Sequence, residues 1–199
     1  MKTAKGKIIF DLIKSRRTIR DFKSTLVPKK DIIKIIDAAR YAPTTGNIQP
    51  WKFVIIQDRK QLNSLCELLQ DSIKKTVAKM TELNDELRLA YLKSSQEAIR
   101  EFMKVPVFIL VFVDTTTYPE FVLYDGCLAI ENLMLAAHAL GYGTAFYTSY
   151  FPEKEVKQFV NASKHHKFIC AIPLGIPKKL PKAPTKKLLK EFIVFDRFK

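Results

Sequence analysis

Three arginines and two hydroxyl side chains lie within six consecutive residues near the amino end of the chain, where the sequence reads S-R-R-T-I-R from Ser15 to Arg20. A guanidinium group forms paired, charge-assisted hydrogen bonds with a phosphate and keeps its charge at every physiological pH. Arg16, Arg17, Thr18 and Arg20 are therefore candidates to bind a phosphate group. Taken alone, the cluster is more typical of a solvated helix end, where cations interact favourably with the helix dipole.

A second polar segment follows about twenty residues later and leads into an apolar strand; it reads A-P-T-T-G-N-I-Q-P-W over residues 42–51. Hydroxyl and amide side chains match both the donors and the acceptors of a flat polar ligand. Pro43, Thr44, Thr45 and Asn47 are therefore candidates to bind such a ligand, and Asn47 is the strongest of them. By themselves, Pro, Thr, Gly and Asn also make ordinary turns between a helix and a strand.

In this order and at this spacing, the two segments resemble the paired motifs of the nitroreductase family of flavin mononucleotide (FMN) enzymes. Asp125–Leu133 is similar to that family's central helix, Gly141–Ala145 to the glycine turn after it, and Ile172–Pro177 to its penultimate strand and turn. The resemblance covers nearly the whole chain except about residues 58–104. It implies that the arginine segment binds the FMN phosphate and that the polar loop binds the pyrimidine edge of the flavin ring.

The same resemblance implies two further groups of binding residues. The backbone of Thr148, Ser149 and Tyr150 would pass the N5 edge of the flavin, and Lys186 and Lys187 would add contacts to the phosphate. Tyr150 departs from the family pattern, which often has a glycine at this position. No catalytic acid or base is predicted, because a bound flavin carries the chemistry and the protein positions it.

The activity that this resemblance implies is that of an FMN-dependent oxidoreductase. NADH or NADPH would reduce the flavin, and a nitroaromatic, quinone or similar acceptor would reoxidise it in a ping-pong mechanism. The family also implies a homodimer with FMN at the subunit interface, in which the arginine segment of one chain meets the polar loop of the other. The implied fold is α+β, with a mainly antiparallel mixed sheet flanked by helices and a C-terminal extension onto the partner.

Two alternatives remain open from the sequence. The first is a flavin-binding protein without reductase turnover. The second is a basic nucleic-acid-binding module, which is suggested only by the net charge of +14 and by a lysine-rich tail. The tail lysines alternate with Pro and Leu rather than with aromatic residues that could stack on bases, so a solvated tail and no nucleic-acid partner are the preferred interpretation.

Composition narrows the class of protein. A chain of 199 residues with 47% hydrophobic content predicts one globular domain over residues 1–199, with a variable helical insertion at about 58–104. The chain shows no secretory leader and no apolar run approaching the ~18 residues of a membrane span, which predicts a cytoplasmic protein without membrane partners. Cys66, Cys127 and Cys170 are expected to be reduced core residues, and the histidines show no metal-ligand spacing.

The elements that must position these residues follow from hydrophobic periodicity and from Gly and Pro. Helices are expected around residues 8–13, from Pro28 to Ala39, twice or three times within 58–104, at Leu123–Leu140, and from Pro152 to about Val160. Strands are expected at Trp51–Ile56, Val105–Val113, Thr144–Tyr147, Phe168–Leu174 and Phe192–Phe195. Strands separated by helices predict a single sheet covered by helices.

Overall fold

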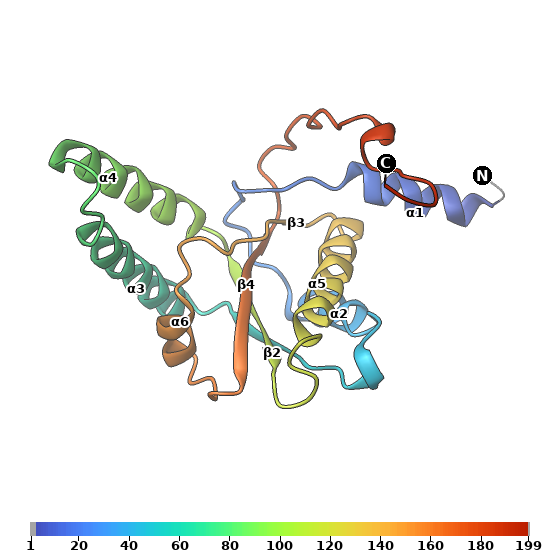
Figure 1. Ribbon diagram of the computed structural model, residues 1–199, viewed down its shortest axis with the longest axis horizontal. Coiled ribbons are helices and arrows are strands. Elements are labelled where there is room, and N and C mark those ends of the chain that lie inside the picture. Colours follow the sequence, from blue (N-terminus) through green and yellow to red (C-terminus); the bar gives the residue numbers. More distant parts are fainter. Residues whose placement is uncertain (1–2, 199) are drawn as a thin grey trace.

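A computed structural model, which describes residues 3–198, has a sheet of four antiparallel strands at the centre of the fold (Figure 1). In the order of the sheet, the strands are β1 (Trp51–Ile56), β2 (Val107–Asp114), β4 (His166–Gly175) and β3 (Gly143–Thr144). The strands β1 and β3 therefore lie at opposite edges. Each neighbouring pair is antiparallel, which confirms the α+β class with a sheet flanked by helices. The four strands form an antiparallel sheet rather than the expected mixed one, and the parallel pairing of Thr18 with Thr144 is an isolated bridge.

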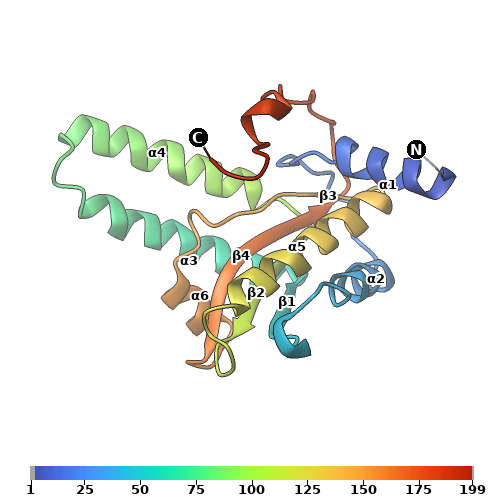
Figure 2. The same cartoon turned by 45° about the vertical axis from the view of Figure 1, so that its right-hand side comes forward.

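Helices cover both faces of the sheet. One face packs against α2 (Lys29–Ala39) and α5 (Val122–Ala139), and the other packs against α3 (Arg59–Ala78), α4 (Asp85–Phe102) and α6 (Glu153–Phe159). The first helix, α1 (Ala4–Ser15), buries none of its residues. Two views show α1 and the α3–α4 pair projecting from opposite sides of the sheet (Figure 1, Figure 2). Within residues 3–198, no helix is both long enough and apolar enough to cross a membrane.

Strand β2 is the centre of the core because it is buried on both faces. Successive side chains of a strand point to opposite faces of the sheet. Accordingly, Phe108, Leu110 and Phe112 pack with the α3–α4–α6 layer, whereas Ile109 and Val111 pack with the α2–α5 layer. This double burial explains why the strand is a continuous apolar run rather than an alternating one.

Helix α5 approaches the sheet closely at a glycine. A Cβ atom placed on Gly126 would collide with Ile169 Cδ1 and would lie 2.8 Å from Val113 Cγ1. Neither approach leaves room for a side chain at this position. Gly126 therefore sets how near α5 lies to β2 and β4, and the residue before it, Asp125, is carried into the interior.

Most of the expected elements are confirmed, and residues 58–104 form two helices, α3 and α4. The strand expected at Thr144–Tyr147 is shorter, since β3 ends at Thr144 and only an isolated bridge joins Tyr147 to Ala171. The strand expected at Phe192–Phe195 is wrong: residues 189–191 form the 3-10 turn η2 (Leu189–Glu191), and the residues after it are exposed. A strand needs a neighbouring backbone for its hydrogen bonds, and the described part of this chain supplies none there.

The prediction for the cysteines is only partly correct. Cys170 is fully buried in β4, and burial raises the pKa of its thiol. Cys66 is half-buried, and Cys127 is exposed on α5, so the expectation that all three are core residues is wrong. Local composition was misleading because α5 also exposes apolar residues beside Cys127, namely Tyr124 and Leu128.

Candidate functional site

The arginine segment runs as extended chain along the outer edge of β3. The backbone N–H of Ile19 donates to the carbonyl of Thr144 over 2.8 Å, and Thr18 and Thr144 form a parallel bridge. Ile19 is buried, so the neighbouring positions Thr18 and Arg20 face outward, as the alternation of a strand requires. A Cβ atom on Gly143 would lie 2.6 Å from Ile19 Cγ1, so the glycine allows this close contact.

The arginine side chains have different surroundings. Arg17 Nη1 donates to the carbonyls of Lys14 and Arg16 over 2.7 and 2.8 Å, and it thereby satisfies acceptors at the end of α1. Arg16 Nε lies 3.8 Å from Glu131 Oε1 of α5. Arg20 is exposed. The interpretation as a basic helix end thus fits Arg17, which donates back to carbonyls at the end of α1. Arg16 is the C-cap residue but its side chain faces Glu131, and Arg20 lies beyond the helix.

Arg16 and Arg17 line a small cavity of about 120 Å³ together with His138, Gly143 and Thr144. Ser15 Oγ and His138 Nε2 are 2.8 Å apart, which ties the end of α1 to the last turn of α5. Burial lowers the pKa of His138, and the nearby charges of Arg16 and Arg17 lower it further. His138 is therefore neutral at neutral pH, and the net charge of the cavity wall comes from the two arginines.

The polar loop at residues 43–47 is held in place by a buried carboxylate. Asp125 Oδ2 accepts hydrogen bonds from Thr44 Oγ1 over 2.9 Å and from the backbone N–H of Thr45 over 3.0 Å. Thr45 Oγ1 donates to Asp125 Oδ1 over 3.3 Å. Both threonine hydroxyls thus brace the loop, while Pro43 and Asn47 are exposed. Asp125 was assigned no role in the sequence analysis. Its position in a largely apolar helix could have indicated a buried carboxylate that needs hydrogen-bond donors.

The loop has an unusual backbone. Gly46, Asn47 and Gln49 have positive φ angles of 55°, 57° and 49°. Asn is tolerated in this left-handed region, whereas Gln adopts it at a cost. Gln49 Nε2 lies 3.3 Å from both the carbonyl oxygen and Oδ1 of Asn47. The arrangement projects the Asn47 amide outward from a short 3-10 turn, η1 (Thr45–Asn47).

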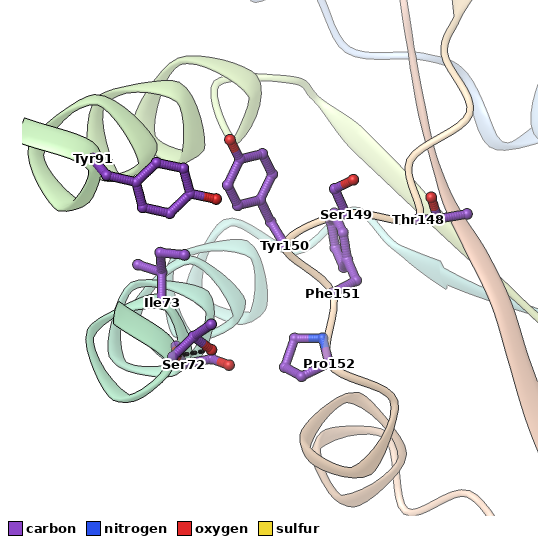
Figure 3. Close-up of a pocket in the computed structure, with 9 residues that line it drawn as sticks. Ser72, Ile73, Tyr91, Thr148, Ser149, Tyr150, Phe151 and Pro152 are labelled. Atoms are coloured by element: carbon purple, nitrogen blue, oxygen red, sulfur yellow. Dashed lines mark hydrogen bonds between the residues drawn. The ribbon is translucent and has the colours of Figure 1, made fainter. Parts of the chain in front are cut away.

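The third predicted group, Thr148 to Tyr150, lines a cavity of about 420 Å³ (Figure 3). The opposite walls are side chains of α3 and α4, including Ser72, Ile73 and Tyr91. The helices of the region between 58 and 104 therefore lie directly across from the segment that the family resemblance assigns to the flavin. Tyr150 has a φ of 68°, a left-handed conformation that glycine adopts without strain, which agrees with the glycine of the family pattern noted from the sequence.

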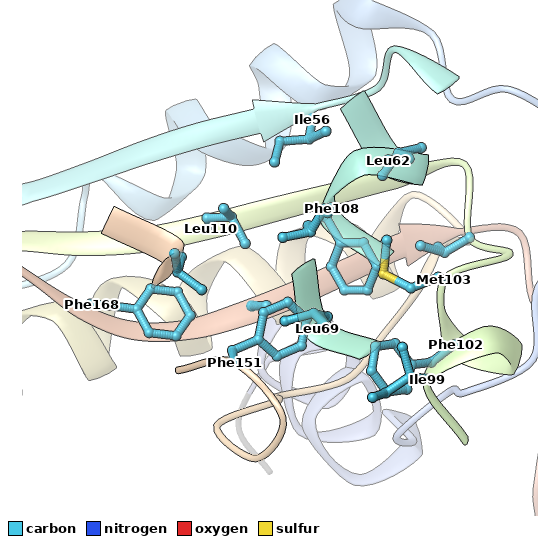
Figure 4. Packing of buried hydrophobic residues seen from close by; sticks show 14 of the residues in the cluster. Ile56, Leu62, Leu69, Ile99, Phe102, Met103, Phe108, Leu110, Phe151 and Phe168 are labelled. Carbon is cyan, nitrogen blue, oxygen red and sulfur yellow. The ribbon is translucent and has the colours of Figure 1, made fainter. Parts of the chain in front are cut away.

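An aromatic cluster supports this segment from the core side (Figure 4). The Phe102 ring centroid lies 4.9 Å from that of Tyr147, 6.0 Å from that of Tyr150 and 5.9 Å from that of Phe151. Burial raises the pKa of Tyr147, and nearby Arg20 opposes the shift. Such ring separations are favourable for aromatic pairs, so the segment rests on a firm apolar base.

The structure does not bring all predicted site residues together within one chain. The arginine segment lies beside β3, whereas the polar loop leads into β1, at the opposite edge of the sheet. Three strand spacings separate these two edges, which is about 14 Å. Lys186 and Lys187 lie in the exposed tail, where Lys187 Nζ is 4.0 Å from Glu191 Oε2. Among residues 3–198, no group of three His, Cys, Asp or Glu side chains is arranged to hold a metal ion.

Comparisons with known proteins agree with this class of α+β protein. Residues 13–176 match the model of the nitroreductase family. An iodotyrosine deiodinase from Thermotoga neapolitana is 30% identical over 196 residues, which cover 95% of this chain and 100% of that protein. The chain therefore belongs to the nitroreductase family.

Solved structures share the fold over nearly the full length. A BluB-like flavoprotein from Clostridium difficile 630 superposes with a TM-score of 0.82 at 26% identity, covering 95% of this chain and 99% of the other. An iodotyrosine deiodinase bound to FMN and 3-iodo-L-tyrosine superposes with a TM-score of 0.77 at 26% identity, covering 96% and 100%. The names of these relatives span more than one reaction, so family membership does not by itself define the substrate.

Proposed function

We propose that the protein is an FMN-dependent oxidoreductase in which NADH or NADPH reduces the flavin and an aromatic acceptor reoxidises it. The observation that carries the proposal is one stretch of chain that joins two cavities. Gly143 and Thr144 line the small cavity with Arg16 and Arg17, and Thr148 to Tyr150 line the large one. An extended chain spans about 13 Å between residues 144 and 148. This separation suits a ligand with a phosphate at one end and a flat ring at the other.

The residues available fit such a ligand. Arg16 and Arg20 supply guanidinium groups for the phosphate, with Thr18 as a hydroxyl donor beside them. The projecting amide of Asn47 supplies a donor and an acceptor for the pyrimidine edge of the ring. Hydrogen-bond donors at that edge would stabilise negative charge on the reduced ring, because they act where the charge develops. When bound, the flavin supplies the hydride and electron transfer.

The partner in this proposal is a second copy of the chain. Because the arginine segment and the polar loop lie at opposite edges of one sheet, a ligand that touches both is served best by one segment from each copy. Exposed apolar side chains support a dimer. Ile8, Ile9 and Phe10 of α1 are 67%, 57% and 51% exposed. Burying apolar surface of this kind drives association.

The tail fits the same assembly. Strand β1 is an edge strand, and a groove of about 570 Å³ beside it is lined by Ile32, Ile33 and Ile55 among others. An open strand edge with an apolar groove can accept an extended segment. The apolar residues at 192–195 of the second copy are the proposed occupant, in line with the C-terminal extension onto the partner that the family resemblance implies.

The test is to load the purified protein with FMN and then add NADH or NADPH without oxygen. We expect a yellow protein whose flavin absorption band bleaches, and a dimer in solution. Arg16→Ala and Asn47→Ala should each lower FMN occupancy, whereas Arg40→Ala, which removes an arginine that pairs with Asp37 outside the site, should not. A protein that binds FMN without bleaching would be a flavin carrier. A colourless monomer that takes up no excess FMN would rule the proposal out.

A further inference from the structure

The large cavity differs from a site built for a charged ligand. Its walls carry hydroxyl groups from Ser72 and Thr76 of α3, from Tyr91 of α4 and from Thr148 and others in the facing segment. Its remaining lining side chains are apolar. Among the described residues that line it, none is an Asp, Glu, Lys, Arg or His. A charged group entering this cavity would find no countercharge among these lining residues to offset the water that it loses there.

Tyr150 is held in this cavity against its backbone preference. Its φ of 68° places a bulky residue in the left-handed region, which glycine would occupy without strain. Such strain persists where the surrounding structure compensates for it, and it often marks a binding site. Phe102 supports the Tyr150 ring from the core. Figure 3 shows Tyr91 reaching from α4 toward Tyr150.

We propose that Tyr91 and Tyr150 form the aromatic walls of the acceptor site, and that this site selects an uncharged planar aromatic ring over the same ring bearing charged groups. The inference rests on the proposed function, because that function places the flavin edge at residues 148–150. Aromatic rings stack or meet edge to face at centroid separations within reach of such a cavity. The hydroxyl groups around it can pair with a carbonyl, nitro or phenol oxygen on the acceptor.

The test compares two ligands with the same iodinated phenol ring. Calorimetric titration of the FMN-loaded, oxidised protein uses 2-iodophenol and 3-iodo-L-tyrosine, at a pH where both phenols are neutral. Only 3-iodo-L-tyrosine carries the ammonium and carboxylate groups. We expect 2-iodophenol to bind at least about tenfold more tightly. Equal or tighter binding of 3-iodo-L-tyrosine would overturn the inference.

Variants then locate the binding site. Tyr91→Ala and Tyr150→Gly should each weaken 2-iodophenol binding by about two- to tenfold. Asn161→Gly is the matched control, because Asn161 also has a positive φ, of 52°, but does not line this cavity. It should leave the affinity unchanged. Unchanged affinity in both tyrosine variants would place the ligand elsewhere and refute the assignment.

Flavin absorbance separates this inference from the proposal on which it rests. FMN occupancy and bleaching by NADH or NADPH are recorded for each variant before the titration. If the protein took up no FMN, both the proposed function and this inference would be refuted. If FMN bound and bleached but the protein bound 2-iodophenol no more tightly than 3-iodo-L-tyrosine, only the assignment of the acceptor site would be refuted.

Discussion

Asp125 connects two parts of the chain that are about eighty residues apart in sequence. Its carboxylate is buried and accepts from two hydroxyls and a backbone N–H, so it fixes the loop that carries Asn47. A carboxylate with several donors is stable in the interior, whereas an unpaired one is not. The polar loop therefore depends on a residue of the central helix rather than on its own turn chemistry alone.

Replacing Asp125 by Asn should expose this dependence. The amide keeps the size of the side chain but turns one acceptor into a donor that faces donors of the loop. We expect the free energy of unfolding, measured with urea, to fall by about 1–3 kcal/mol, and FMN retention to fall with it. Asp114→Asn is the control, since Asp114 accepts from Thr116 at an exposed position. If the Asp125 variant were as stable as this control, the role of Asp125 in fixing the polar loop would be contradicted.

We expect the contribution of Tyr142 to the free energy of unfolding to change in alkaline solution. Its hydroxyl donates to Asp31 Oδ2 over 2.7 Å, and burial together with Asp31 raises the pKa of Tyr142 to about 12. The unfolded chain would titrate near the ordinary value of about 10. The contribution of this tyrosine is thus complete below about pH 10 and is lost as the pH rises toward about 12. Urea unfolding of Tyr142→Phe should differ from the parent by a constant amount below that window and by less within it.

The sequence indicated the polar residues of the site but not their hydrogen-bond partners. Thr44 and Thr45 were predicted as ligand contacts because their hydroxyls can pair with a polar ligand and because the loop resembles a family motif, and these hydroxyls donate to Asp125. The ligand role stays a prediction. Such pairing depends on tertiary structure, which local patterns do not contain. The positive φ of Tyr150 was equally absent from local sequence patterns, although the departure from the family pattern noted there concerned the same residue.

At the scale of elements, α5 is the helix on which the site is assembled. Its first turn holds the polar loop through Asp125, and its last turn meets the end of α1 through His138. Its contact with the sheet requires the absence of a side chain at Gly126. The position of α5 against β2 and β4 therefore sets the positions of both segments that carry the predicted ligand contacts.

Gly126→Ala tests this close packing. The added methyl group would collide with Ile169 and Val113, so the helix or the sheet must shift. We expect a loss of about 1–3 kcal/mol in the free energy of unfolding. Gly6→Ala in α1 is the control; its Cβ would meet only Thr3 Oγ1 at 3.3 Å, and alanine favours a helix. Equal stability of the two variants in urea would show that α5 can move without cost.

The regular elements were predictable where their periodicity was strong. The strand at Trp51–Ile56 and the central helix agree with the sequence to within a residue. Residues 58–104 were harder because they contain no Gly or Pro. The local signal for the start of α4 was Asn84, whose side chain caps that helix, and the sequence interpretation did not use it. The error at Phe192–Phe195 has another cause. A β-branched, aromatic run favours a strand, but pairing requires a neighbouring backbone.

At the scale of the whole molecule, the chain has more surface than a compact monomer. It exposes 13277 Å². A compact monomer of 22.9 kDa would expose about 9,600 Å². The excess comes from projecting parts, including α1 and the tail at residues 178–198, which is exposed throughout. These are the same parts that the proposed dimer would cover.

Removing the residues after Lys187 should therefore weaken the dimer. The deleted segment includes Phe192 and Phe195, which are 66% and 83% exposed and are available to the groove beside β1 of a second copy. We expect the truncated protein to dissociate at higher concentrations than the parent does in analytical ultracentrifugation, because apolar contact area is lost. Substituting Lys190 by Gln in the full chain is the control for the one net positive charge that the deletion removes. Identical dissociation of the truncated and parent proteins would disprove the proposed docking.

The placement of the arginine segment and the polar loop at opposite sheet edges allows complementation between two defective subunits. Arg16→Ala and Asn47→Ala chains, each poor at retaining FMN alone, would form a mixed dimer with one site lacking both residues and one site with both intact. Refolding the two chains together should restore up to one FMN per mixed dimer. No recovery in verified heterodimers would mean that each chain binds its ligand by itself.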